Sequence, residues 1–273
     1  MKKIFAWLGV VVAVLVVAGG IGVARFFGFI LVDLDDTPPV IPIDLARPAV
    51  LVFSKANGFV HVDALPAGKT MLENIAAENG WGIFQTENGA VMAPELLEKF
   101  DVIVWNNTSG TTLSEQQQSA FKDYLEQGGG FVGIHAAGGD PWYSWKWYVN
   151  DLIGAQFIGH TMDPHFQDAD VLVLESADPI VAHLPSRWRV PAEEWYGFDS
   201  SARDKGHTVL LALDEETYDP NNSGMEGEHP STWKRDIGQG RMFYTAIGHQ
   251  AATYDLPEFR EMVEKAISWA GNF

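Results

Sequence analysis

The sequence contains no cysteine. This absence excludes disulfide bonds, thiolate metal sites and a cysteine nucleophile. Positive charge is also scarce, since 18 Lys and Arg residues stand against 36 Asp and Glu, for a net charge of −18. Such a chain could not neutralise a row of phosphates, so we expect no nucleic-acid partner. Apolar residues are plentiful at 47%, enough for a sizeable core.

The N-terminus carries a long apolar run. Met-Lys-Lys precedes residues 4–24, which include no charged residue, and about 21 apolar residues can span a membrane. The two lysines favour a cytoplasmic start, which places the rest of the chain on the extracytoplasmic, periplasmic side. The alternative is a cleaved signal peptide, which would make the protein secreted or periplasmic, but this run exceeds the usual signal-peptide core of ~7–15 residues. We therefore expect residues 1–32 to form a transmembrane anchor.

Residues 33–48 include four prolines, which predicts an extended linker that adds nothing to the core. From residue 49, apolar strand patterns at 49–53, 82–85, 101–105 and 131–134 alternate with helix patterns at 68–79 and 94–100 and after Ser114. This order predicts one α/β domain over residues 49–273, with a mostly parallel sheet and helices on both faces. Later strand candidates are 171–176, 207–213 and 241–248, followed by a C-terminal helix opened by Pro257.

Four histidines follow expected strands. His135 follows FVGI, His249 follows FYTAIG, His160 follows AQFIG, and His61 lies in the loop after the first strand. A lone histidine is most often structural, but ligands in doubly wound sheets bind beyond the carboxyl ends of the strands. The four together therefore predict a shared site. His135 occupies the sharp strand-to-helix elbow where α/β enzymes place a nucleophile, so we expect it to face a cleft.

Other polar and aromatic groups are candidates for the same site. Asn106 and Thr108 follow the third strand, where ligand hydrogen bonds are common, although ordinary turn chemistry explains them equally well. Glu194 could orient an imidazole, whereas Glu193 is expected to be a solvated surface residue. Trp147 lies in the aromatic segment WYSWKWY and could stack on a sugar, or pack in the core.

The remaining histidines carry weaker signals. His229, in EHPSTW, is a candidate for binding substrate hydroxyl groups. His165 is ambiguous because it lies only five residues beyond His160. We expect His183 and His207 to be structural or surface residues.

The chain resembles the ThuA-like family, named for trehalose utilisation, from about residue 49 to the C-terminus. The matching segments are NGFVH, WNNTSG, GGGFVGIHAA, GAQFIGH, EEWY, EHPSTW and GRMFYTAIGH. The resemblance implies a flavodoxin-like, class I glutamine amidotransferase-like fold with its elbow at His135. True glutaminases carry a cysteine at that elbow, so the resemblance does not extend to thioester chemistry. Val60 and Val62 depart from the basic and acidic residues that often flank the loop histidine in the family, which weakens transfer of substrate specificity.

These observations favour a carbohydrate-active enzyme that moves protons on a sugar or keto-sugar, in hydrolysis, elimination or isomerisation. His135 would be the central acid or base, with His61, His160 and His249 as further acid/base groups or ligands. One alternative is a non-catalytic sugar-binding or scaffold module. Another is that His135, His160 and His249 bind a divalent metal such as zinc.

Overall fold

A computed structural model describes residues 33–273 of the protein. The expected anchor over residues 1–32 lies outside the described residues, and its prediction stays untested. Within residues 33–273, no helix is both long enough and apolar enough to cross a membrane.

One half of the central sheet is parallel. The strands of this half are β1 (Ala49–Phe53), β2 (Gly82–Thr86), β3 (Val102–Asn106), β4 (Gly130–Ile134) and β11 (Gly240–Thr245). They lie side by side in the order β2-β1-β3-β4-β11. Apolar runs such as AVLVF and VIVWN are buried along their whole length, as expected for strands covered on both faces. The predicted parallel core is therefore confirmed, with β4 near its middle.

The other half is antiparallel, so the predicted, largely parallel sheet is in fact mixed. Beyond β11, the described residues complete a nine-stranded sheet with β10 (Pro230–Ile237), β9 (Thr208–Leu213), β6 (Gln167–Val173) and β7 (Arg187–Glu193). A separate pair joins β5 (Phe157–His160) to β8 (Tyr196–Phe198). Strand β7 alternates buried and exposed residues and lacks the apolar run that marks the parallel strands.

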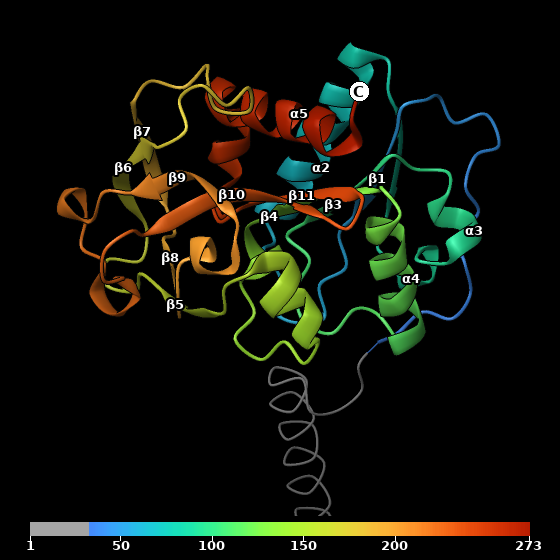
Figure 1. The fold of residues 1–273 in the computed structure, drawn as a ribbon, viewed down its shortest axis with the longest axis horizontal. Coiled ribbons are helices and arrows are strands. Elements are labelled where there is room, and N and C mark those ends of the chain that lie inside the picture. The colour runs from blue at the N-terminus through green and yellow to red at the C-terminus, as the bar shows by residue number, and fades with distance from the viewer. Residues whose placement is uncertain (1–32) are drawn as a thin grey trace, which may run out of the picture.

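Helices cover both faces of the sheet (Figure 1). Helices α2 (Ala64–Asn79) and α5 (Pro257–Gly271) lie on one face, and α3 (Pro94–Leu97) and α4 (Glu115–Glu126) lie on the other. Helix α4 begins with a capping box, in which Ser114 accepts from the Gln117 backbone N–H and the Gln117 side chain accepts from the Ser114 N–H. The two cores that result hold the parallel strands rigidly from both sides.

The prediction that residues 33–48 add nothing to the core is wrong. They form neither a helix nor a strand, and they pack on the domain, with Ile41 buried among the core residues. The Asp35 carboxylate accepts from Lys55 Nζ at 2.6 Å and from the Gly89 backbone N–H at 2.7 Å. Lys55 is itself buried, so Asp35 supplies the countercharge that its ammonium group needs.

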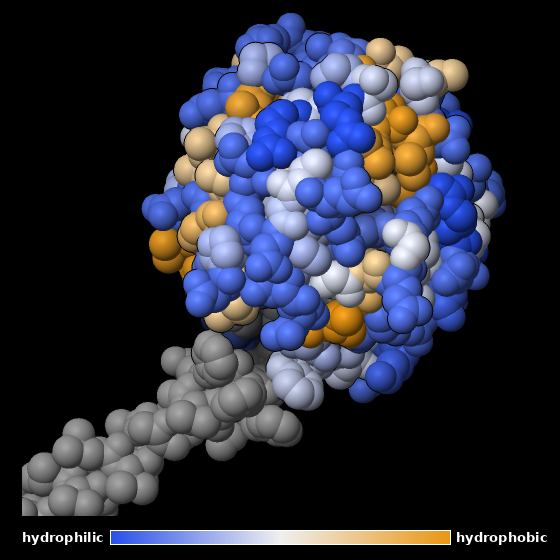
Figure 2. All heavy atoms as spheres, turned by 90° about the vertical axis from the view of Figure 1, so that its left-hand side faces the viewer, coloured by the Kyte–Doolittle hydropathy of each residue, from blue (hydrophilic) through white to orange (hydrophobic). Residues whose placement is uncertain are grey.

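The sheet ends at β7, where Arg187 and Arg189 point outward and pair with Asp170 on β6. Charged side chains on an edge strand discourage pairing with another chain. Figure 2 views the molecule from this side and shows a largely hydrophilic face with separate, small hydrophobic patches.

Candidate functional site

His135 stands at the elbow after β4 with a backbone φ of +50°. Few residues other than glycine adopt a positive φ, and its occurrence is concentrated at functional sites. Its Nδ1 lies 2.6 Å from the Ala246 carbonyl oxygen, and its own carbonyl accepts from Tyr244 Oη at 2.8 Å. The expectation that His135 faces an open cleft is wrong, because the residue is fully buried: other site residues cover it.

Two of the predicted partners cover His135 directly. The His61 ring centroid lies 4.8 Å from that of His135 and 4.7 Å from that of His249, and the His135 and His249 centroids are 5.1 Å apart. These rings follow β1, β4 and β11, three parallel strands whose carboxyl ends share one edge of the sheet. The predicted convergence at this edge is therefore found in the structure.

Glu194 lies at the centre of the histidines. Its Oε2 is 3.0 Å from His249 Nδ1 and 3.3 Å from His135 Nε2. Its Oε1 is 3.2 Å from His160 Nδ1 and in close contact with His165 Nε2. The side chain is almost completely buried, so one carboxylate joins four imidazoles from separate parts of the chain.

The electrostatics of this cluster keep Glu194 ionised and His61 neutral. Burial by itself would raise the pKa of Glu194, but contacts with His135 and His249 outweigh it and hold the pKa well below its usual range. Burial lowers the pKa of His61 to about 2, and the neighbouring His135 and His249 add to the shift. Burial and the Glu194 charge raise the pKa of Tyr196. Its hydroxyl therefore stays protonated and can donate to His135 Nε2 at 2.8 Å.

Glu193 is not the solvated surface residue that we expected. It is fully buried and accepts hydrogen bonds from the backbone N–H groups of Gly248, His249 and Glu194 and from the Thr253 hydroxyl. These bonds tie the end of β7 to the loop that carries His249. Glu193 thus positions two members of the cluster, Glu194 and His249, relative to each other.

Asn106 and Thr108 lie at the predicted edge but are fully buried. Asn106 Nδ2 donates to the Leu65 carbonyl at 3.0 Å, and the Thr108 hydroxyl donates to the Phe53 carbonyl at 3.0 Å. These bonds hold the loop after β1, which carries His61. Their geometry thus matches scaffold roles.

His229 is also buried, away from the cluster. Its Nε2 lies 2.7 Å from the Tyr196 carbonyl oxygen and its Nδ1 lies 2.6 Å from Glu215 Oε1. Both ring nitrogens are therefore engaged within the protein, and the residue supports the backbone of Tyr196 from behind. His183 and His207 also bond to backbone carbonyls outside the cluster, as expected of structural residues.

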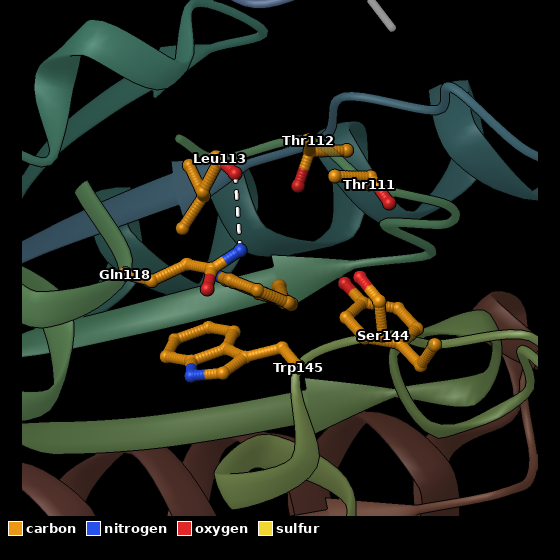
Figure 3. A pocket seen from close by; sticks show the side chains of 8 residues that line it. Thr111, Thr112, Leu113, Gln118, Ser144 and Trp145 are labelled. Atoms are coloured by element: carbon orange, nitrogen blue, oxygen red, sulfur yellow. Dashed lines mark hydrogen bonds between the residues drawn. The ribbon is translucent and has the colours of Figure 1, made fainter. Parts of the chain in front are cut away.

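Trp147 packs against Trp145 and beneath Lys122 of α4. Trp145 and Tyr143 line a narrow hollow with Gln118, whose amide donates to the Leu113 carbonyl (Figure 3). This hollow leaves no room for a water molecule. The aromatic segment therefore builds mainly core, and we locate the candidate site by its convergent titratable groups instead.

Partly exposed aromatic rings border the histidine cluster. The Phe59 ring lies 4.8 Å from that of His61 and is 60% exposed. The Phe166 ring lies 4.0 Å from that of His165 and 5.1 Å from that of His249, and is 42% exposed. His160 and His165 are also partly open to solvent. The cluster thus has an accessible side lined by apolar rings.

Sequence reasoning gave no role to His165 and Tyr196. Tyr196 opens the three-residue strand β8 and His165 lies in the loop between β5 and β6, and no apolar run marks either position. The EEWY segment was a signal that could have found Tyr196. In the structure, Tyr196 is the partner of His160 across the β5–β8 pair. His165 is brought to Glu194 by the loop after β5.

The fold and the elbow define a class I glutamine amidotransferase-like α/β protein in which a buried histidine replaces the elbow nucleophile. The family model for ThuA, described as trehalose utilisation, matches residues 49–270. The chain belongs to this ThuA family. No curated protein matches the sequence significantly.

Solved structures give the same assignment. A ThuA-like protein from Bacteroides uniformis is 25% identical with a TM-score of 0.72, and the match covers 86% of this chain and 95% of that chain. A second, from Parabacteroides merdae, is 18% identical with a TM-score of 0.64 over 83% and 90% of the two chains. A β-galactosidase from Rahnella sp. R3 shares the fold alone, at 13% identity and a TM-score of 0.53, over 82% of this chain and 31% of that one.

Proposed function

We propose that the domain is a carbohydrate-processing enzyme whose chemistry takes place at the His–Glu cluster. The observation that carries the proposal is the convergence of His135, His249, His160 and His165 on the buried carboxylate of Glu194. The imidazoles lower the pKa of Glu194, and carboxylates with pKa values shifted in this way by charge partners cluster at functional sites. The link to carbohydrate rests on the trehalose-utilisation family.

The residues divide into those that move protons and those that position them. His160 and His165 are partly exposed and contact the same Glu194 oxygen, so they are placed to exchange protons with a substrate at the accessible side. His61 and His135, which are buried, and His249, which is slightly exposed, form the inner group. Glu194 contacts His160 and His165 through Oε1 and His135 and His249 through Oε2, so it fixes the two groups relative to each other. Proton transfer by such groups supports hydrolysis, elimination or isomerisation of a sugar or keto-sugar.

Phe59 and Phe166 suit a sugar substrate at the accessible side. A sugar ring presents C–H groups on its faces and hydroxyls at its edge. Two partly exposed aromatic rings next to His61 and His249 offer surfaces on which such a face can stack, while the imidazoles reach the hydroxyls.

We further propose that residues 1–32 anchor the protein in the membrane with the domain outside the cytoplasm. The support is the uncharged run over residues 4–24 after two lysines. Membrane fractionation together with mass spectrometry of the mature N-terminus tests this. A mature chain that begins beyond residue 24 would replace the anchor with a cleaved signal peptide.

To test the enzyme proposal, the protein is incubated with a panel of disaccharides, trehalose included, and their keto derivatives. Proton NMR in deuterated water monitors each reaction. Turnover appears as new anomeric signals or as loss of proton signal at an exchanging carbon. His165→Gln should reduce turnover by at least about a hundredfold, the contribution of a positioned proton-transfer group. His183→Gln is the matched control, because His183 bonds to the Glu258 carbonyl and should leave turnover unchanged. Sugar binding without turnover across the panel would establish the non-catalytic binding module instead.

A further inference from the structure

In the inner group, two imidazole nitrogens, from His135 and His249, and one carboxylate oxygen, from Glu194, lie close together. The His135 Nδ1 faces the Ala246 carbonyl oxygen at 2.6 Å, and a carbonyl oxygen can only accept, so Nδ1 carries the proton. In the neutral ring, Nε2 then presents a lone pair. That nitrogen lies 3.2 Å from His249 Nδ1 and 3.3 Å from Glu194 Oε2.

These three atoms form a nearly regular triangle, since His249 Nδ1 and Glu194 Oε2 are 3.0 Å apart. A proton can bridge only one edge of a triangle, whereas a cation near its centre attracts all three lone pairs. Zinc ligands at about 2.0–2.2 Å from the ion in a tetrahedron are roughly 3.3–3.6 Å from one another. The observed edges differ from this spacing by a few tenths of an ångström at most.

His61 supplies a fourth position. One ligating atom from each of His61, His135, Glu194 and His249 lies within 4.8 Å of the others. His61 is only 7% exposed, and its Nδ1 has no hydrogen-bond partner among the described residues. An unpartnered, buried imidazole nitrogen is rare without a ligand.

From this geometry we propose that His61, His135, His249 and Glu194 bind one divalent transition-metal ion, with Zn²⁺ the best match. Three imidazoles and one carboxylate suit zinc and its neighbours, whereas Ca²⁺ and Mg²⁺ prefer oxygen ligands throughout. The group differs from the set His135, His160 and His249 that the sequence suggested. His160 lies instead with His165 on the other oxygen of Glu194.

Surrounding contacts fit the proposal. Metal-binding histidines commonly donate their second N–H to a backbone carbonyl or a carboxylate, as His135 does to Ala246. His165 holds Glu194 through Oε1, leaving Oε2 directed at the inner group. Glu193 fixes the backbone N–H of His249 at 2.9 Å.

One contact competes with the metal. The Tyr196 hydroxyl lies 2.8 Å from His135 Nε2, the same lone pair that a metal would use, so binding requires this hydroxyl to release its hydrogen bond. Tyr196→Phe should therefore bind metal at least as tightly as wild type. The proposal does not depend on sugar turnover, since a binding module could hold the ion equally well.

The test uses the purified full-length protein without a histidine tag, stripped with chelator and titrated with Zn²⁺ by calorimetry. Cobalt substitution gives a visible spectrum for tetrahedral coordination. We expect one ion per chain. His249→Ala and Glu194→Gln should each weaken Kd by more than about 100-fold, since changing a residue that only hydrogen-bonds to a metal ligand already costs about 10–100-fold. His183→Ala is the control and should retain wild-type Kd and stoichiometry. Circular dichroism checks that each variant is folded.

Two results would overturn the proposal. One is the absence of stoichiometric binding to the folded wild-type protein. The other is binding that survives in His249→Ala but is lost in His160→Ala, which would place the ion in the group formed by His160, His165 and Glu194. A rise in wild-type melting temperature with Zn²⁺ that is missing in folded His249→Ala would confirm the assignment independently of calorimetry.

Discussion

Replacing Glu193 with Gln tests whether a buried carboxylate holds the site together. In the wild type, Glu193 Oε1 accepts from the N–H groups of Glu194 and His249, both at 2.9 Å. Oε2 accepts from the Gly248 N–H at 3.2 Å and the Thr253 hydroxyl at 2.6 Å. A glutamine can keep its oxygen at only one of these positions. If its amide nitrogen takes the Oε2 position, Thr253 can rotate to accept, but the Gly248 N–H is left without an acceptor.

The magnitude follows from these bonds. An unsatisfied buried donor costs roughly 1–3 kcal/mol, and bonds to a neutral amide are about half as strong as those to a carboxylate. We therefore expect Glu193→Gln to lower the free energy of unfolding by about 3 kcal/mol. For a domain of this size, that corresponds to a fall in Tm of roughly 6–12 °C.

Urea denaturation followed by circular dichroism measures the change. Glu175→Gln is the matched control, because Glu175 is exposed and surface substitutions stay within about 0.5 kcal/mol of wild type. If Glu193→Gln is as stable as this control, the four hydrogen bonds do not exist in solution as described, and Glu193 does not position His249.

Three further predictions concern the linker, the His249 loop and the accessible side. Asp35→Asn removes the partner of buried Lys55 and should lower the free energy of unfolding by about 2 kcal/mol. Burial raises the pKa of Asp35, but the Lys55 hydrogen bond and other contacts outweigh burial and lower this pKa from 3.8. The loss of unfolding free energy in Asp35→Asn, measured in urea titrations, should therefore have its full size above pH 3.8 and shrink as the pH falls through the lowered pKa. A loss that stays constant down to about pH 2 would contradict this. Gly248→Ala should destabilise by about 1–3 kcal/mol in the same assay, because Gly248 has a φ of +131° and a Cβ there would lie 2.9 Å from Ile134 Cγ2; unchanged stability would argue against this loop geometry. Phe166→Ala should raise KM for the sugar identified in the panel with little change in kcat, and an unchanged KM would remove Phe166 from the substrate surface.

The sequence predicted the parallel half of the fold well, because buried parallel strands are continuous apolar runs that need no partner to be recognised. In the antiparallel half it predicted β9 and part of β6 but missed β7. Strand β7, RWRVPAE, has charged residues on its exposed face, so its pattern resembles a loop. The predicted linker has no helix or strand, but composition alone could not show that Ile41 and Asp35 dock on the domain.

The same division explains what was found of the site. His61, His135 and His249 follow strands of the parallel half, so topology alone brings them to one edge of the sheet. The positions of Glu193 and Tyr196 depend on the pairing of β7 with β6 and of β8 with β5. No local sequence pattern indicates these pairings. The sequence also could not predict that His135 is buried. An elbow residue is ordinarily exposed, and the groups that cover His135 are far away in the chain.

The segment that leads from β7 into β8 therefore determines the surroundings of the elbow. In many α/β enzymes the elbow projects a reactive side chain above the sheet. Here that segment places Glu194 and Tyr196 against His135, so the elbow side chain is buried among polar partners instead of exposed. A buried imidazole beside an ionised carboxylate retains a lone pair that can hold a cation or a proton, and its strained backbone fixes the direction of that lone pair. Because the elbow is covered in this way, His160 and His165 are the imidazoles of the cluster that are most open to solvent.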